Sequence, residues 1–75
     1  MSPALPSVTG REVVKALLAV GFQQVSVKGS HFKLAHPDGR RTIVPMHGGR
    51  DLPRGTVASI LRQADLRATE LAAHL

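Results

Sequence analysis

The stretch QVSVKGSHFKLAH, residues 24–36, decides how this chain folds. Apolar and polar residues alternate on both sides of a Gly-Ser pair, with Val25 and Val27 before it and Phe32 and Leu34 after it. Alternation with a period of two is typical of a strand with one buried face, and a Gly-Ser pair suits a tight turn. The stretch therefore predicts a β-hairpin.

Side chains on the second strand of this hairpin alternate between the two faces of the sheet. His31, Lys33 and Ala35 share one face, while Phe32 and Leu34 share the other. Because the aromatic and leucine side chains are the apolar pair, we expect them to meet the core. His31 and Lys33 are then left on the solvent side.

A second turn follows at Pro37-Asp38-Gly39-Arg40, where the Asp-Gly pair tolerates positive φ angles. A third strand then ends at Pro45, which cannot donate to a strand ladder. The expected strands cover about residues 22–28, 31–36 and 41–45.

A helix is predicted before the hairpin, over residues 10–20. Thr9 and Glu12 stand at the spacing of a capping box, in which the hydroxyl accepts from the glutamate amide and the carboxylate reaches back. Gly21 follows the helix, at a position where a left-handed residue is common. The apolar residues of this segment recur on one helical face: Val13, Val14, Leu17 and Leu18.

A second helix is predicted after the third strand, over residues 53–64. Asp51 precedes it as a candidate cap, and Pro53 suits its first turn. Its apolar face consists of Val57, Ile60, Leu61 and Ala64. Beyond residue 66 the apolar spacing allows one more short helix.

This order of elements predicts an α+β fold, a three-stranded antiparallel sheet with helices packed on one face and a short C-terminal helix. A chain of 75 residues buries only about 60% of its unfolded surface, so it supports one core. Residues 1–8 contain two prolines, two serines and no charge, and we expect a flexible tail there. Residues 9–75 then form the single domain.

The chain is strongly basic, with 10 Lys and Arg against 5 Asp and Glu and a formal net charge of +5. Such an excess attracts phosphate backbones, although an acidic membrane or an acidic protein would satisfy the charge equally well. No apolar run long enough to span a membrane is present, and the first residues lack the features of a signal peptide. We therefore expect a cytoplasmic protein that does not bind membranes.

Two histidines are candidates for proton transfer, because imidazole titrates near neutrality. His31 follows the Gly-Ser turn, and His47 lies where the third strand passes into a loop. Each also has a plain interpretation: His31 as an exposed turn residue, and His47 as a partner of the backbone or a cap of the next helix. His36 and His74 are expected to be incidental.

A metal site is not expected. Zinc requires three or four converging ligands, whereas these histidines are spread over two strand faces and a loop, and the chain has no cysteine. The sequence also lacks a phosphate-binding glycine loop followed by Lys and Ser, which argues against nucleotide hydrolysis. We expect no cofactor.

The element order, GSHFKL at residues 29–34 and VPMHGGRDLPRGTVASILRQADL at residues 44–66 together resemble the HicA family of small bacterial toxins. The resemblance covers roughly residues 9–66. It implies a fold like the double-stranded RNA-binding domain and a metal-independent ribonuclease that cleaves mRNA. It also implies inhibition by a HicB-like antitoxin. We expect the toxin to be monomeric when free and to form a hetero-oligomer with that antitoxin.

The resemblance implies that His31 is the catalytic residue, and RNA cleavage needs a base that takes the proton from a 2′-hydroxyl. His47 is an auxiliary candidate, which leaves the general acid unassigned. The expected RNA-binding residues are Lys28, Gly29, Ser30, Lys33, Arg40 and Arg41.

A non-catalytic RNA-binding module of the same fold is the alternative, with His31 contributing only a hydrogen bond to a phosphate or a 2′-hydroxyl. The chain contains two phenylalanines and no other aromatic residue, which argues against base stacking but does not separate cleavage from binding.

Overall fold

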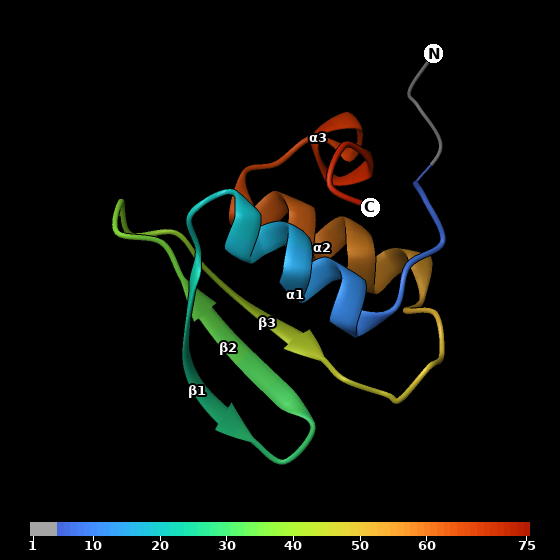
Figure 1. Ribbon diagram of the computed structural model, residues 1–75, viewed down its shortest axis with the longest axis horizontal. Coiled ribbons are helices and arrows are strands. Elements are labelled where there is room, and N and C mark those ends of the chain that lie inside the picture. Colours follow the sequence, from blue (N-terminus) through green and yellow to red (C-terminus); the bar gives the residue numbers. More distant parts are fainter. Residues whose placement is uncertain (1–4) are drawn as a thin grey trace.

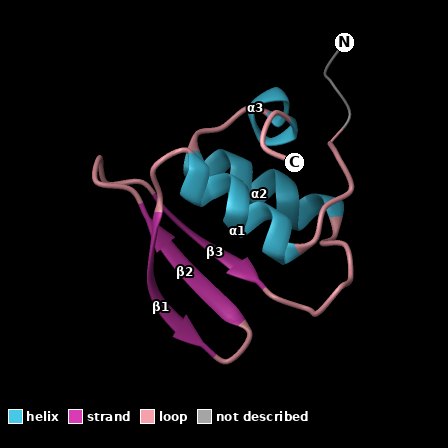
Figure 2. Ribbon diagram, viewed as in Figure 1, coloured by secondary structure: helices cyan, strands magenta, loops and turns pink. Residues whose placement is uncertain are grey.

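The predicted hairpin forms two strands of a three-stranded antiparallel sheet in which β2 lies between β1 and β3 (Figures 1 and 2). The computed structural model describes residues 5–75, and within them the α+β architecture is confirmed. The elements in chain order are α1 (Gly10–Ala19), β1 (Gln23–Lys28), β2 (His31–Ala35), β3 (Arg41–Pro45), α2 (Arg54–Ala64) and α3 (Ala68–Ala72).

The register of the sheet confirms the predicted faces of β2. His31 lies opposite Lys28 on β1 and Pro45 on β3, and Lys33 lies opposite Ile43. Directly opposed residues of antiparallel strands point to the same side, so these side chains share one face. Leu34, one residue further along, is only 1% exposed on the other face.

Both long helices cover that second face. In Figure 1, α1 and α2 lie on the same side of the sheet, and α3 lies beyond them. Core residues come from both helices, from β2 and β3 and from the segments before α1 and α2, whereas every residue of β1 is exposed. The opposite face, which carries His31, is left open by the described chain. We call it the outer face.

Helix α1 begins as the sequence predicts. The Thr9 hydroxyl accepts from the Glu12 amide at 3.2 Å, and the Glu12 carboxylate accepts from the Thr9 amide at 3.0 Å, so the capping box is complete. Gly21 follows the helix with a φ of +103°, the left-handed conformation expected there.

The predicted Asp51 cap of α2 is wrong. The helix begins after Pro53, and no side chain caps it. Asp51 instead pairs with Thr9 in an isolated antiparallel bridge, beside a hydrogen bond of 2.7 Å from the Leu52 amide to the Val8 carbonyl. This pairing holds the chain extended through Asp51, two residues before a cap would be needed.

The N-terminal segment also differs from its prediction as a tail. Residues 1–4 lie outside the described part of the chain, but Val8 is completely buried and Leu5 packs against the core. Burying an isopropyl group contributes about 1.5–3 kcal/mol relative to leaving it exposed. The domain therefore begins before residue 9.

The short C-terminal helix is present and packs on the core through Leu71, which is 1% exposed. Glu70 accepts a hydrogen bond from the Arg67 amide at 3.0 Å, which satisfies one of the free donors at the start of this helix. None of the helices in residues 5–75 is both long and apolar enough to cross a membrane.

Gly10 and Gly55 both lie in helices, but we expect their replacement by alanine to change the stability of the fold in opposite directions. A Cβ at Gly10 would overlap the Pro45 carbonyl oxygen and crowd the Met46 sulfur, whereas a Cβ at Gly55 would meet nothing within 4 Å. Gly10→Ala should lower the free energy of unfolding by about 1–3 kcal/mol because α1 must move off the end of β3. Gly55→Ala should raise it by about 0.5 kcal/mol, because alanine has the better helix propensity.

Denaturant unfolding followed by circular dichroism measures both variants on the same scale. Equal effects of the two substitutions would show that the close packing of α1 against the end of β3 does not contribute to stability.

Candidate functional site

His31 occupies the first position of β2, directly after the turn that joins it to β1. The turn uses Gly29 in the left-handed conformation, with a φ of +58°. The carbonyl of Ser30 accepts a hydrogen bond of 2.6 Å from the amide of Met46, which ties the turn to the segment that follows β3. The imidazole is exposed but stands on a backbone held from both neighbouring strands.

Three of the predicted RNA-binding cations share the outer face with His31. Lys28 lies directly opposite His31, a position at which Cβ atoms are typically about 4.5–5.5 Å apart. Lys33 stands two residues along β2, and Arg41 lies opposite Ala35 on β3. All three cations are exposed, so this face presents positive charge around an accessible imidazole.

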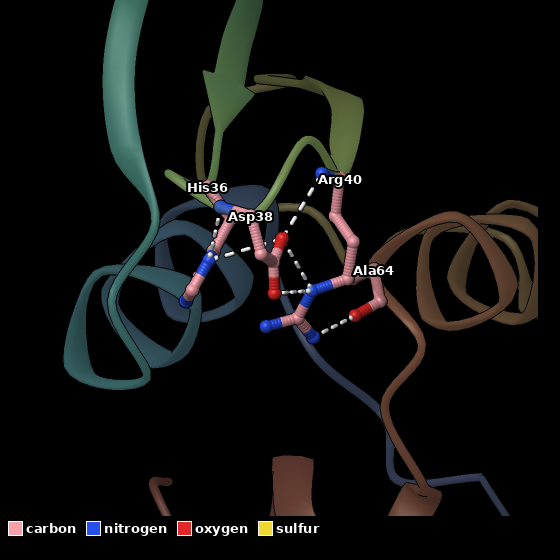
Figure 3. A network of polar contacts seen from close by, with 4 residues as sticks. All are labelled: His36, Asp38, Arg40 and Ala64. Atoms are coloured by element: carbon pink, nitrogen blue, oxygen red, sulfur yellow. Dashed lines mark hydrogen bonds and ion pairs between the residues drawn. The ribbon is translucent and has the colours of Figure 1, made fainter.

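Arg40 is placed differently from its neighbour Arg41. Its Nε donates to both carboxylate oxygens of Asp38, at 2.9 and 3.1 Å, and its Nη1 donates to the Ala64 carbonyl at the end of α2 (Figure 3). The guanidinium carbon also lies 5.1 Å from the centre of the Phe22 ring. Arg40 thus connects the β2–β3 turn to the helical layer.

His36 belongs to the same network, which explains a residue that the sequence suggests to be incidental. Its Nδ1 accepts from the Asp38 amide at 3.2 Å, and its ring meets Phe22 edge to face at 5.2 Å. Binding to the Asp38 carboxylate, 3.1 Å away, would require a proton on Nδ1 instead. A Cβ at Gly21 would approach the other ring nitrogen to 2.8 Å, so the glycine makes room for this ring.

His47 lies in the loop between β3 and α2. It lines a hollow of about 520 Å³ together with Arg50, Asp51 and Pro53. The Arg50 amide donates to the His47 carbonyl at 3.3 Å, which makes the loop a turn at this point. The bond from Met46 to Ser30 holds the start of the loop beside the turn that precedes His31.

The described residues contain no group of three or more His, Asp or Glu side chains placed to hold a metal ion. The histidines come from separate places: His31 from the outer face, His36 from the Asp38 network and His47 from the loop. The sequence suggested this dispersion by placing them on two strand faces and a loop.

Fold and site together define a class: a small basic α+β domain with an accessible histidine on an open, cationic sheet face. The family of HicA toxins of bacterial toxin–antitoxin systems matches residues 10–66. A protein of Pseudomonas fluorescens (strain Pf0-1) named "Probable mRNA interferase HicA" is 37% identical over 51 residues, covering 68% of this chain and 83% of that protein. The chain belongs to the HicA toxin family.

The Arg40–Asp38 pair predicts a contribution to acid stability. Hydrogen bonds from the Arg40 side chain hold the pKa of Asp38 below its ordinary value of 3.8. A carboxyl whose pKa is lower in the folded state than in the unfolded state stabilises the folded state at any pH above the unfolded-state pKa. This stabilisation is lost as the pH falls through the folded-state pKa. The unfolding temperature of the wild type should therefore fall more steeply below pH 3.8 than that of Asp38→Asn.

Thermal unfolding from neutral to acid pH provides the measurement, with Asp51→Asn as the control at an exposed carboxyl. Parallel curves for the wild type and Asp38→Asn would contradict a stabilising role for the pair.

Proposed function

We propose that this chain is the endoribonuclease of a toxin–antitoxin pair and that it cleaves mRNA with His31 as its catalytic residue. The observation that carries the proposal is the position of His31, accessible on the outer face with Lys28 opposite and Lys33 beside it on the same face. Membership in the HicA family and the interferase name of the Pseudomonas relative support the reaction.

His31 acts as the base in this scheme. The imidazole takes the proton of a ribose 2′-hydroxyl, and the oxygen attacks the adjacent phosphorus while the bond from phosphorus to the 5′-oxygen breaks. The products are a 2′,3′-cyclic phosphate and a 5′-hydroxyl end. The lysine cations stabilise the negative charge that develops on the phosphate oxygens.

The leaving 5′-oxygen needs a proton, and His47 is the auxiliary candidate to supply it. The hydrogen bond between Met46 and Ser30 brings its loop to the same end of the sheet as His31. Arg50 lines the hollow beside it and adds positive charge there. The scheme uses no metal ion and no cofactor, because imidazole can serve as both base and acid near neutral pH.

Of the predicted RNA contacts, Lys28, Lys33 and Arg41 hold the phosphates in this proposal. Gly29 and Ser30 let the RNA backbone approach the turn, and a Cβ built at Gly29 would stand in open space. We assign Arg40 to the domain itself, because its guanidinium is already bonded to Asp38 and to α2.

The same exposed face is where a HicB-like antitoxin would inhibit the toxin, by covering His31 and the cations around it. In this proposal the free toxin is monomeric and the inhibited form is a hetero-oligomer of toxin and antitoxin. Both forms are located in the cytoplasm, where mRNA is found.

Replacing His31 tests catalysis directly. His31→Ala should lower the rate of RNA cleavage by about 10²-fold or more, because general-base catalysis contributes that much. Expressed without antitoxin, the variant should no longer halt growth or degrade mRNA. His74→Ala, at an exposed position after α3, is the matched control and should behave as the wild type.

Purified protein adds two readouts: cyclic phosphate at the new RNA ends and cleavage that persists in excess chelator. Undiminished mRNA degradation by folded His31→Ala would remove the histidine from the mechanism. A wild type that binds RNA without cutting it would favour the non-catalytic module.

We expect substitutions of Arg40 and Arg41 to have different effects, one on the stability of the fold and the other on RNA binding. Arg41→Gln should weaken RNA binding and reduce the slope of log affinity against log salt by about 0.7, the value for one phosphate of a single strand. Arg40→Gln should leave this slope unchanged but lower the unfolding temperature, because it breaks the bonds to Asp38 and Ala64. Salt titrations of RNA binding and thermal unfolding of both variants measure the contrast, and a reduced slope in Arg40→Gln would contradict it.

A further inference from the structure

A hollow of about 550 Å³ lies against the sheet, and most of its lining residues belong to the outer face that carries His31. Two aliphatic side chains line it while largely exposed, Val25 at 60% and Ile43 at 46%. The register of β1 shifts between Gln24 and Ser26, so Val25 sits at an irregularity in an edge strand. Bulges of this kind are common next to binding sites, where they redirect a side chain.

The lining combines an apolar surface with positive charge. Lys33 and Arg41 line the same hollow as Val25 and Ile43, and Lys33 follows His31 by one step along the face. The volume lies within the range of sites for small organic groups, which are mostly apolar with a few polar contacts. A nucleobase with its phosphates has this composition: an apolar face, a polar edge and negative charge on either side.

The hollow also has a polar residue that is held by a hydrogen bond. Gln63 of α2 lines it, and the Gln63 Oε1 accepts a hydrogen bond of 2.7 Å from the hydroxyl of Thr42. Thr42 is itself 4% exposed, so the anchor is buried. With the carbonyl end of the carboxamide engaged in this way, its NH₂ group is the end available to a ligand, and it can only donate.

We propose that this hollow is a nucleobase subsite that selects the base next to the scissile phosphate. The inference rests on the proposed function and extends it to sequence preference. The face of the base packs on Val25 and Ile43, the neighbouring phosphates meet Lys33 and Arg41, and the Gln63 NH₂ donates to the edge of the base. Guanine and uracil offer carbonyl oxygens at that edge where adenine and cytosine offer amino groups, so cleavage favours the first two.

Two features favour RNA as the occupant: the hollow adjoins His31 on the outer face, and the cations Lys33 and Arg41 line it. A base on Val25 and Ile43 joins directly to a phosphate at His31 on the same face, and Gln63 meets the edge of the base from the helix side of the edge strand β3. A protein segment with acidic and apolar side chains is the competing occupant, and the experiments below separate the two.

The decisive variant is Gln63→Glu, at an exposed position on α2. One carboxylate oxygen of the new glutamate can still accept the hydrogen bond from Thr42. The other oxygen replaces the NH₂ group of Gln63, so the base meets a hydrogen-bond acceptor in place of a donor. Cleavage sites are mapped in a randomised RNA pool. The wild type should show a preference for G and U of about threefold to tenfold at one position beside the cut, as one hydrogen bond provides. Gln63→Glu should shift this preference to A and C.

The valines of β1 supply a matched control. Val25→Ser should flatten the base preference by removing the apolar surface. Val27→Ser should leave it unchanged, because Val27 lies opposite Phe32 on the other face and is similarly exposed, at 49%. An unchanged preference in both Gln63→Glu and Val25→Ser would overturn the subsite. So would a Val25→Ser protein that loses its antitoxin while keeping its base preference, because the hollow would then be a protein-binding surface.

Binding without cleavage keeps the two proposals distinguishable. In the His31→Ala background, the affinities for oligouridylate and oligoadenylate are compared by fluorescence anisotropy, with and without Gln63→Glu. The subsite predicts tighter binding of oligouridylate and a reversal in the double variant. Equal affinities would overturn it even if the wild type cleaves RNA, whereas a selective wild type that cuts no RNA would overturn the catalytic proposal alone.

Discussion

The register of β2 between its two neighbours is the constraint on which the rest of this structure depends. A slip of one residue would turn His31 and Lys33 toward the helices and expose Phe32 and Leu34. Both ends of the strand are held against such a slip. The bond from Met46 to Ser30 holds the end that bears the candidate site, and the network of His36, Asp38 and Arg40 holds the other.

Most of the secondary structure could be predicted because its causes are local. The alternation around Gly29, the capping box at Thr9 and the helical spacing of the apolar residues act within a few positions of each other. The Asp51 cap and the tail at Val8 were wrong for one shared reason. A backbone pairing between two segments more than forty residues apart in the sequence decides both, and no local pattern shows it.

The candidate site divides in the same way. The alternation of β2 correctly predicts that His31 and Lys33 share the open face. Arg40 and Arg41 look like one cationic feature in the sequence. In the structure Arg40 binds Asp38 and α2, whereas Arg41 lies on the outer face. Gln63 could not be identified as a lining residue from the sequence, because its link to Thr42 joins a helix to a strand 21 positions away.

The open face follows from where the helices lie. The two long helices and α3 cover one side of a three-stranded sheet, and residues 5–75 contain no further helix or strand to cover the other. Apolar side chains such as Val25 and Ile43 therefore lie on the surface beside the cations, in a domain whose single core lies entirely behind the sheet. An RNA strand and an antitoxin that both use this face must compete for it. Under the proposed function, inhibition then needs no conformational change in the toxin, only a partner whose affinity for the face exceeds that of mRNA.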